Sequence, residues 1–562
     1  MPSSYTNPVY PYVHSPDQDA ARPVHHPVII VGGGPAGLAA AMDLALQGVH
    51  TVVLDDNNTV SVGSRAICLA KRTLEICDRY GCGQPMLDKG VTWNLGRVYF
   101  GEEQVYEFNL LPEQDHKVPA FINLQQYYME EYMVKRCMQM PQIELRWLHK
   151  VTRVETDNAG VEITVSTGDG DYRLTCDYLL VADGANSPIR ESLGLESKGQ
   201  VFEDRFLIAD IIMKADFPAE RRFWFDAPFH PGQSTLLHKQ ADNVWRIDFQ
   251  LGWDADPEEE KRLENIRPRV EAMLGKDREW ELEWASVYTF RCRKMDSFIH
   301  NRAFFIGDSA HQVSPFGARG ANGALQSVEN LGWKLAAVMQ GRAPASLLQT
   351  YDTERQHGAR ENILHSTRAT DFMTPKNHVT RVFRDTVLDM SRQFPFARSL
   401  VNSGRLSQPC TYEDTPLNTA DSEEFSCALR PGSACVDAPV SGGNHSGWLL
   451  NHLGSHFSVI VKGGFDPGQF DALHDMAARL RARGEPIDII RVDAPGGDSA
   501  DTLYLGDDRG VLSARYDLQS AAVYLIRPDQ HVAARWRRLD ANAIEAALKR
   551  ALGYELPAEH AA

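Results

Sequence analysis

The stretch FIGDSAHQVSPFGARGAN, residues 305–322, brings an aspartate, two serines and a histidine into a few positions. Asp308, Ser309 and His311 are the residue types of a hydrolase triad, in which a histidine base activates a serine hydroxyl. The members of such a triad normally come from separate parts of a chain, so this crowding does not support one. An apolar run precedes the stretch and a long helical pattern follows it, which is typical of a loop that lines a ligand site. We therefore expect Ser309 and His311 to be structural.

A glycine-rich turn near the N-terminus has the surroundings that a dinucleotide site needs. The apolar run 28–31 predicts a buried parallel strand. The glycines of a G-x-G-x-x-G pattern, Gly32, Gly34 and Gly37, then open an alanine-rich helix, whose free N–H groups attract a pyrophosphate. A second apolar run ends in Asp55, where a carboxylate can accept hydrogen bonds from ribose hydroxyls. Because an acid at this position disfavours a 2′-phosphate, the pattern leaves FAD or NAD as the ligand.

Two further segments combine a strand with an Asp–Gly or Gly–Asp pair. Asp183-Gly184 follows an apolar strand, and Gly307-Asp308 follows another in the opening stretch. In their order and approximate spacing, these two pairs and the first glycine turn resemble the three fingerprints of the class A flavoprotein aromatic hydroxylases, which are p-hydroxybenzoate hydroxylase-like FAD monooxygenases. The resemblance covers roughly residues 28–355. It is greatest to the branch that includes phenol hydroxylase-like and 3-(3-hydroxyphenyl)propionate hydroxylase-like enzymes, which carry a C-terminal thioredoxin-like domain.

The resemblance implies a role for each matched position. Asp55 would bind the adenosine ribose, and Asp308 the ribitol chain of FAD. Asp183 would belong to the motif that links FAD binding with pyridine-nucleotide binding, and the loop 315–322 would line the isoalloxazine ring. The helix that follows this loop points its N-terminus at the ring, so its dipole would stabilise the negative charge of a reduced flavin. The implied cofactor-binding residues are Gly32, Gly34, Ala36, Gly37, Asp55, Arg65, Gln126, Asp183, Gly184, Gly307, Asp308, Pro315, Gly317, Gly320, Ala321 and Asn322.

The fold class that follows is a multidomain α/β and α+β protein. It would combine a Rossmann-like FAD-binding domain of the GR2 type, an antiparallel-sheet substrate domain and a C-terminal thioredoxin-like domain that lacks a C-x-x-C motif. The expected boundaries are a disordered or loosely packed N-terminal arm at 1–24, a discontinuous FAD-binding domain at 25–195 and 296–373, a substrate-binding sheet at 196–295 with contributions from about 91–122, a helical linker at 374–425, and the thioredoxin-like domain at 426–562.

The middle segment alternates apolar and aromatic residues with period two, which predicts an antiparallel sheet. The resemblance places this sheet over the flavin, with a phenolic substrate between the two. Hydroxylation of a phenol needs a group that helps to remove the phenol proton. His238 and Tyr288 are candidates for that group, and Arg246 is a candidate anchor for a carboxylate. For each of them the alternative is a packing or surface role.

Cys77 and Cys82 stand in C-x₄-C spacing, where a flavin disulfide reductase could place a redox pair. A reductase would also require a second G-x-G-x-x-G domain for NAD(P)H, and the sequence contains none. We therefore expect both cysteines to be apolar packing residues of a helix and its C-terminal turn.

The composition limits the partners. A formal net charge of −17 over 562 residues argues against a nucleic-acid or anionic-membrane partner. No apolar run is long enough to span a membrane, and the nine scattered cysteines fit a reducing cytoplasm better than a disulfide framework. No His, Cys and Asp cluster has metal-ligand spacing. We expect a cytoplasmic protein, a homodimer, with a small aromatic substrate.

The predicted function is an FAD-dependent monooxygenase that hydroxylates a phenolic or related aromatic compound, as in aromatic compound catabolism. The resemblance implies that NADH or NADPH reduces the flavin and that O₂ then forms a C4a-hydroperoxide, which attacks the substrate ring. Epoxidation, Baeyer–Villiger oxidation and decarboxylative hydroxylation are alternatives within flavoproteins. A flavin-loaded binding or scaffold protein is the alternative from another class.

Overall fold

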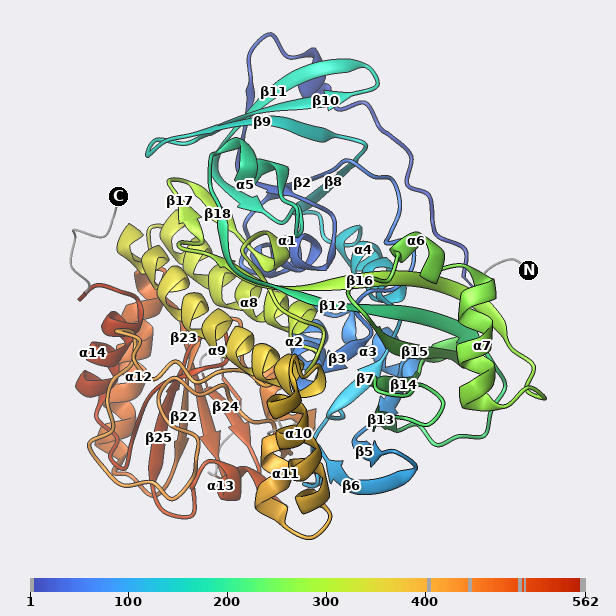
Figure 1. Ribbon diagram of the computed structural model, residues 1–562. Helices are drawn as coiled ribbons and strands as arrows, with labels where there is room; N and C mark the ends of the chain where they lie inside the picture. Colours follow the sequence, from blue (N-terminus) through green and yellow to red (C-terminus); the bar gives the residue numbers. More distant parts are fainter. Residues whose placement is uncertain (1–4, 402–405, 443–446, 494–497, 500–501, 556–562) are drawn as a thin grey trace.

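A computed structural model describes residues 5–401, 406–442, 447–493, 498–499 and 502–555. The chain forms three sheet-centred parts that meet around one long buried helix, α8 (Gly320–Met339), near the middle of the molecule (Figure 1). Residues far apart in sequence therefore converge on this helix.

The first part is built on a sheet whose central strands are parallel. Its strand order is β17 (Ile299–His300), β18 (Ala303–Phe305), β11 (Gly170–Val181), β1 (Val24–Val31), β2 (Thr51–Asp55) and β8 (Ile143–Trp147), with β10 (Val161–Thr167) and β9 (Lys150–Thr156) continuing from β11 as antiparallel strands. The end of β1 is wholly apolar and buried, because helices and further chain cover both faces of a parallel sheet. The helices of this part are α1 (Pro35–Leu46), α2 (Lys71–Tyr80), α3 (Gly83–Lys89), α4 (Gln126–Cys137), α5 (Pro188–Ser192), α8 and α9 (Gln349–Met373).

A small three-stranded sheet lies beside these helices and faces the second part of the molecule. It consists of β3 (Cys68–Ala70), β7 (Phe121–Asn123) and β4 (Val91–Trp93), with β7 in the centre. Asn123 connects it to the second part, because its side-chain amide donates to the carbonyl of Lys239 at 2.8 Å.

The second part is an eight-stranded sheet. Its order is β19 (His311–Gln312), β16 (Glu281–Met295), β12 (Ser197–Ile212), β15 (Val244–Leu251), β14 (Thr235–Lys239), β13 (Arg221–Phe225), β5 (Leu95–Phe100) and β6 (Glu103–Asn109), and every pairing is antiparallel except that of β13 with β5. One face packs apolar side chains such as Leu237 and Ile247 against α7 (Leu263–Leu274), which follows the short α6 (Pro257–Glu260). The other face turns toward the first part, so the alternation along each strand separates two environments.

The third part is a mixed five-stranded sheet in the order β24 (Thr502–Leu505), β23 (Ile487–Val492), β22 (Phe457–Lys462), β25 (Ala522–Ile526) and β26 (Val532–Trp536). β22 and β23 are parallel, while β25 and β26 run antiparallel. Helices α12 (Pro467–Ala482) and α14 (Ala541–Ala551) share an apolar cluster with one face, and α13 (Val511–Arg515) belongs to the cluster on the other face. Helices α10 (His378–Ser391) and α11 (Pro395–Val401) precede this part in the chain.

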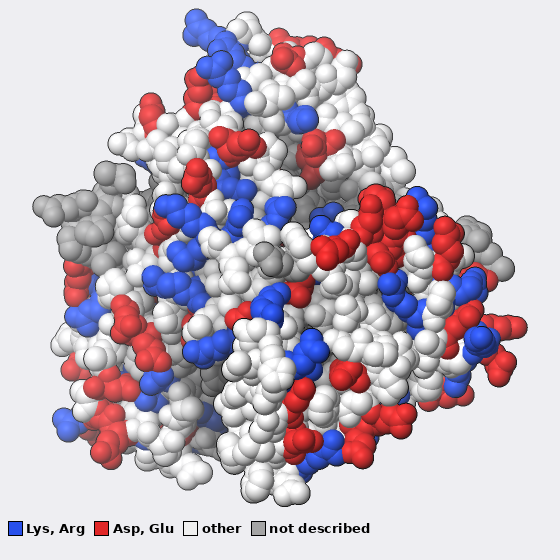
Figure 2. Space-filling view, viewed as in Figure 1, with Lys and Arg blue, Asp and Glu red and all other residues white. Residues whose placement is uncertain are grey.

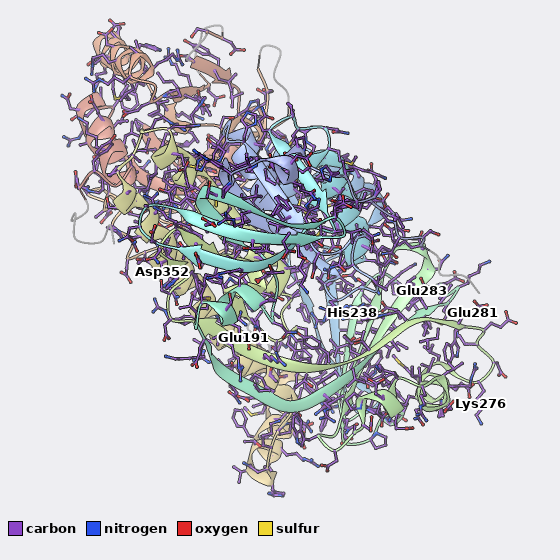
Figure 3. All side chains as sticks on the ribbon, turned by 90° about the horizontal axis from the view of Figure 1, so that it is seen from above. Glu191, His238, Lys276, Glu281, Glu283 and Asp352 are labelled. Atoms are coloured by element: carbon purple, nitrogen blue, oxygen red, sulfur yellow. The ribbon has the colours of Figure 1, made fainter. Side chains whose placement is uncertain are left out.

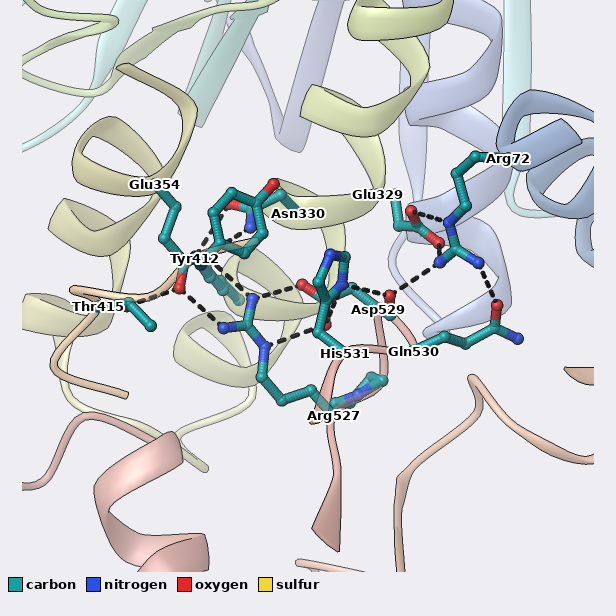
Figure 4. Close-up of polar contacts among 12 residues, drawn as sticks. Arg72, Glu329, Asn330, Glu354, Tyr412, Thr415, Arg527, Asp529, Gln530 and His531 are labelled. Carbon is teal, nitrogen blue, oxygen red and sulfur yellow. Dashed lines mark hydrogen bonds and ion pairs between the residues drawn. The ribbon is translucent and has the colours of Figure 1, made fainter. Parts of the chain in front are cut away.

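Charged side chains without solvent exposure join the third part to α8 and α9 (Figure 4). Arg527, after β25, lies 2.7 Å from Glu354 of α9, and Lys334 of α8 lies 2.7 Å from the same carboxylate. Burial disfavours ionisation of Glu354, but Arg527 and Lys334 outweigh it and lower the pKa of this carboxyl. Buried positive and negative side chains that neutralise one another therefore attach the third part to α8 and α9.

The N-terminal arm differs from the expectation of a disordered or loosely packed segment. From residue 5 it packs along the first part: Tyr10 stacks on Trp147 with ring centroids 4.6 Å apart, and Tyr12 stacks on His149 at 5.2 Å. The carboxylate of Asp17 accepts from Arg146 at 2.6 Å. Aromatic and charged partners thus order a segment whose proline content suggested otherwise.

No helix within the described ranges is long and apolar enough to cross a membrane.

Candidate functional site

The first glycine turn is shaped by close contacts on two of its three motif positions. Gly32 has φ +111° and lies so near β11 that a Cβ would be 2.4 Å from the carbonyl oxygen of Ala182. A Cβ on Gly37 would be 1.9 Å from the carbonyl oxygen of Gly32. At Gly34, by contrast, a Cβ would meet no described atom within 4 Å. Two glycines therefore allow the turn to close, and the third leaves space in front of α1.

Asp55 stands beside this turn at the end of β2. Its carboxylate accepts from the backbone N–H of Gly33 at 2.5 Å and from that of Asn57 at 2.8 Å. Burial raises the pKa of this carboxyl, and the two backbone donors oppose the rise. The carboxylate is thus fixed next to the start of α1, where the sequence predicted a contact with a ribose.

The second motif forms the turn from β11 into α5. Asp183 accepts from the backbone N–H of Ile189 at 3.1 Å, while its other carboxylate oxygen is buried without a partner in the described chain. Ser187 caps the same helix. Arg190 donates to the carbonyl oxygen of Ser309 at 2.7 Å, so this motif is bonded directly to the third one.

The third motif confirms that no triad exists at Asp308, Ser309 and His311. The hydroxyl of Ser309 donates to the carbonyl of Val181 at 2.7 Å, and the ring of His311 lies 3.3 Å from the hydroxyl of Ser327. Burial, with the charge of Arg355, lowers the pKa of His311 to about 3. Both residues are structural, as predicted.

Asp308, Arg65 and Tyr288 come from three different segments, and their charges influence one another. Part of Asp308 is in contact with solvent, but protein surrounds its carboxyl group. This desolvation raises the pKa of the carboxyl to about 6, and the charge of Arg65 opposes the rise. Burial and the charge of Asp308 raise the pKa of Tyr288. Tyr288 was expected beside the substrate. The charges of two predicted cofactor residues, Arg65 and Asp308, act on it.

The glycine-rich loop ends at the N-terminus of α8, which no side chain caps. Gly317 has φ +95°, in the left-handed region that glycine adopts without strain. Asn322 holds the helix start in place: its amide accepts from the backbone N–H of Ala70 at 2.9 Å and donates to the carbonyl of Cys68 at 2.9 Å. The side chain of Asn322 is thus occupied by β3, while the first N–H groups of α8 point into the loop.

Gln126 is likewise bonded within the protein. Its carbonyl oxygen accepts from the backbone N–H of Ala66 at 3.0 Å, and its amide donates to Glu130 at 2.8 Å. Gln126 therefore fixes the segment that carries Arg65.

These features fit a bound FAD. Two uncapped helix starts, α1 and α8, lie at the ends of a site in which Asp55 and Asp308 offer carboxylates to hydroxyl groups. Gly34 leaves room for a close ligand, and one oxygen of Asp183 is unpartnered. A diphosphate favours a helix N-terminus, and sugar hydroxyls favour carboxylates.

The sheet face turned toward this site carries a polar cluster. His238 of β14 is only 4% exposed, and its Nε2 lies 3.9 Å from the carboxylate of Asp248 on β15. Nδ1 of His238 and one oxygen of Asp248 are buried without a partner in the described chain. Burial lowers the pKa of His238 well below its usual range and raises that of Asp248 to about 6. Figure 3 shows His238 among the sheet strands where they approach the FAD-binding part.

Arg246 belongs to this cluster but is already bound. Its guanidinium donates twice to Asp210 at 2.8 Å, and further to the carbonyls of Ser64 and Arg65. We therefore assign Arg246 the role of positioning the Arg65 segment, in place of the expected contact with a substrate carboxylate.

Aromatic rings continue the same face toward the glycine-rich loop. Phe316 of the loop meets Phe206 and Phe290 edge to face, with ring centroids 5.1 and 4.9 Å apart. The loop that is expected beside the flavin ring is therefore in contact with an aromatic wall of the sheet.

Comparison with known proteins identifies the chain. Residues 25–366 match the family model described as FAD binding domain, which is more than half of the chain. The chain belongs to this FAD-binding family. This flavoprotein is 26% identical to a 3-(3-hydroxy-phenyl)propionate/3-hydroxycinnamic acid hydroxylase of Mycobacterium sp. (strain JLS), over 90% of this chain and 88% of the relative.

Solved structures share its fold. The flavin-dependent monooxygenase PieE, in complex with FAD and substrate, matches the flavoprotein with a TM-score of 0.80 at 22% identity, over 95% of this chain and 100% of that one. Aklavinone-11 hydroxylase, with FAD and aklavinone, matches with a TM-score of 0.75 at 22% identity, over 94% and 99%. The predicted family, the mixed α/β flavin monooxygenase fold, the FAD cofactor and the oxidoreductase class are thereby confirmed.

Sequence reasoning missed Asp210, Arg221 and Asp248 of the flavoprotein's sheet. Each sits in an alternating strand, a pattern that marks one face but not which face. The usable signal was the occurrence of several charged residues in strands otherwise rich in aromatic and β-branched residues.

The cysteines are free thiols. Cys77 and Cys82 are both buried, in α2 and directly before α3. Among the described residues of the flavoprotein, no group of three or more His, Cys, Asp or Glu side chains is arranged to hold a metal ion.

Proposed function

We propose that this flavoprotein hydroxylates a phenolic aromatic compound, with NADH or NADPH as reductant and O₂ as oxidant. The observation that carries the proposal is the contact between the glycine-rich loop before α8 and the aromatic face of the sheet, through Phe316. The relatives named as hydroxylases support the reaction class. FAD, when bound, supplies the electron transfer and the activation of oxygen.

The residues of the chain supply binding, orientation and shielding. The aromatic wall binds a flat ring by stacking and edge contacts. The sheet covers the loop and so keeps water from the reacting atoms. The uncapped start of α8 stabilises negative charge on whatever lies before it.

We assign His238 the task of accepting the phenol proton. Nδ1 of His238 is buried without a partner in the described chain and is therefore available as an acceptor, while burial and the charges of Arg221 and Arg246 lower the pKa and keep the imidazole neutral. Asp248 lies beside the other nitrogen and has a pKa of about 6, so it can stabilise the imidazolium that forms. Tyr288, whose pKa is raised by burial and by the charge of Asp308, is a candidate for a contact at the cofactor side of the substrate.

NAD(P)H oxidation by the FAD-loaded protein, measured with a panel of phenols, tests the function. Phenols should stimulate oxidation, and mass spectrometry with ¹⁸O₂ should find one labelled hydroxyl on the ring. A labelled epoxide, an ester from Baeyer–Villiger oxidation or loss of CO₂ would assign one of the alternative reactions. Tight FAD binding without stimulation by any aromatic compound would support a binding or scaffold protein and refute the hydroxylase.

We further propose that the third part is a thioredoxin-like domain and that the flavoprotein is a cytoplasmic homodimer. The strand order β23–β22–β25–β26, with a helix after β22 and another after β26, supports a thioredoxin-like third domain. The homodimer is supported by an apolar face over α10 and α11, which appears as a largely uncharged area low in Figure 2. Its exposed residues are Val379, Val382, Phe383, Phe394, Phe396 and Leu400. Mass measurement in solution tests the dimer, and fractionation of cells tests the cytoplasmic location.

A further inference from the structure

Asn123, the last residue of β7, joins three elements through its buried side chain. Its carbonyl oxygen accepts from the indole N–H of Trp93 at 2.8 Å and from the thiol of Cys68 at 3.2 Å. Its amide nitrogen donates to the carbonyl of Lys239 at 2.8 Å. Because the oxygen has two donors and the nitrogen has an acceptor, the amide group is held in one orientation.

On one side, Asn123 is bonded to the residue next to the candidate proton acceptor. Lys239 follows His238 on β14, and its carbonyl is the acceptor of the Asn123 amide. Gln125 repeats this contact two residues further along the chain, because its amide donates to the carbonyl of Ala241 at 3.1 Å. The amides at 123 and 125 therefore hold the carbonyls at 239 and 241, where β14 turns into β15.

The tip of this turn is attached to the same part of the molecule. Asp242 and Asn243 have φ +60° and +58°, a conformation that aspartate and asparagine tolerate. The carboxylate of Asp242 accepts from the hydroxyl of Tyr128 and from the ammonium of Lys89, at 2.6 Å each. Tyr128 is on α4, which begins directly after Gln125. The turn is thus bonded to the FAD-binding part at its tip as well as at its base.

On the other side, Asn123 is connected to the start of α8. It is paired with Cys68 in the register of β3 with β7. The carbonyl of Cys68 accepts from the side-chain amide of Asn322 at 2.9 Å, and the backbone N–H of Ala70 donates to the same side chain at 2.9 Å. Asn322 belongs to the first turn of α8, which faces the predicted flavin ring.

The path from His238 to the start of α8 therefore consists of hydrogen bonds and one short pair of strands. Its amide side chains are withdrawn from solvent, since Asn123 is 3% exposed, and Gln125 and Asn322 are each 1% exposed. Hydrogen bonds in such surroundings face little competition from water. This path fixes the separation between the imidazole and the helix start.

We propose that Asn123 is a positioning residue, which holds His238 at the distance from the predicted flavin ring that proton transfer from a bound phenol requires. This inference rests on the proposed hydroxylase function. Proton transfer needs its two heavy atoms within hydrogen-bond reach, so a small displacement of β14 lowers its rate. Gln125 assists Asn123 from the adjacent contact.

The ionisation of bound 4-nitrophenol tests this role without turnover, because the phenol and phenolate forms of this probe absorb at different wavelengths. A pH titration of the FAD-loaded enzyme, saturated with the probe, gives its ionisation constant in the site. Asn123→Ala and Gln125→Met should each lower that constant by roughly 3- to 10-fold relative to the wild type, because a displaced His238 no longer accepts the proton. Gln125→Met nearly conserves the side-chain volume, so it carries the test if Asn123→Ala does not fold.

Asn418→Ala is the matched control. The amide of Asn418 also donates to a backbone carbonyl, that of Tyr412 at 2.7 Å, in a segment that packs on the third part. This variant should leave the ionisation constant unchanged. In a His238→Gln background, Asn123→Ala should have no further effect on the constant, because Asn123 acts through His238.

Turnover gives a second readout. With 3-ethylphenol at neutral pH, kcat of Asn123→Ala should fall by about 10-fold while KM changes little, because proton transfer is impaired and binding is not. The deficit should shrink as the pH rises and the phenol ionises in solution. A deficit of the same size at every pH would indicate a general disturbance of the site and would overturn the positioning role.

The inference and the proposed function fail separately. Wild-type ionisation constants in both Asn123→Ala and Gln125→Met, or an equal change in Asn418→Ala, would refute the role of Asn123 and leave the hydroxylase standing. Absence of any phenol-stimulated NAD(P)H oxidation by the wild type would refute the hydroxylase and, with it, the positioning role.

Discussion

Arg527 of the third part of the molecule donates from both terminal nitrogens to the carboxylate of Glu354 on α9, at 2.7 and 2.9 Å, and both side chains are fully excluded from solvent. The guanidinium of Arg527 also pairs with the carboxylate of Asp529, and Lys334 of α8 pairs with the carboxylate of Glu354. The contact between the third part and helices α8 and α9 is therefore buried like the interior of a protein, and it differs from a hydrated contact between separate modules.

Arg527→Met should destabilise the FAD-loaded protein by about 3–5 kcal/mol, because it leaves Glu354 and Asp529 as buried anions with too few cations. Denaturant unfolding, followed by the fluorescence of the released flavin, measures this loss. Lys135→Met is the matched control, since its partner Glu131 forms an exposed pair on one helix and the loss should stay within about 0.5 kcal/mol. Equal effects in both variants would contradict the assignment.

Two glycine variants should separate folding from cofactor binding. Gly37→Ala places a Cβ 1.9 Å from the carbonyl oxygen of Gly32, so this variant should lose thermal stability even without FAD. Gly34→Ala meets no described atom, so the FAD-free protein should keep its melting temperature and bind FAD weakly. Melting curves and flavin titration of both variants measure the difference. Normal FAD affinity in Gly34→Ala would show that the ligand does not approach there.

The pKa of about 6 at Asp308 predicts a pH dependence of the FAD-free protein. Below about pH 4 the carboxyl is protonated in both folded and unfolded states, and between about pH 4 and 6 the folded state holds the proton more tightly. Stability from this group therefore falls as the pH rises through that window. Asp308→Asn removes the dependence, so the melting temperature of this variant relative to wild type should rise between pH 4 and 7. A constant difference would argue against the raised pKa.

The N-terminal arm should contribute to FAD binding through Tyr10. Its ring stacks on Trp147, and Trp147 closes the space behind Gly33, where Asp55 is held. Tyr10→Ala should weaken FAD binding by about 2- to 10-fold, the range expected for loss of one aromatic pair. Val9→Ala is the control, because Val9 is 71% exposed. A titration of the FAD-free proteins with FAD measures both, and similar affinities would contradict the prediction.

The cofactor side could be predicted from sequence because its motifs are local. The glycine turn begins directly after β1, Asp55 ends β2 and the pair at 307–308 comes just after β18, so a short stretch of chain fixes both residue and position. The side chains of Gln126 and Asn322 were assigned to the cofactor by resemblance, but in the structure they hold neighbouring segments together.

The substrate side depends on strand pairing, which no local pattern contains. Whether Arg246 is free or occupied is decided by Asp210, 36 residues earlier in the chain and opposite it on β12. The effect of the Arg221 charge on Asp248 likewise depends on the order β13–β14–β15. The packing of Tyr10 was missed for the same reason, since Trp147 becomes its neighbour only after folding.

Helix α8 connects the predicted flavin site with the buried charges beneath the third part of the molecule. Its first residues lie at the predicted flavin ring, and Lys334, near its other end, is bonded into the charges beneath the third domain. With 20 residues it is a rigid rod of roughly 30 Å. A tilt of about 2° at one end would move the other by about 1 Å, which is enough to disturb a reacting geometry. The buried charges around Lys334 therefore help to fix the direction of a helix whose other end lies at the predicted cofactor site.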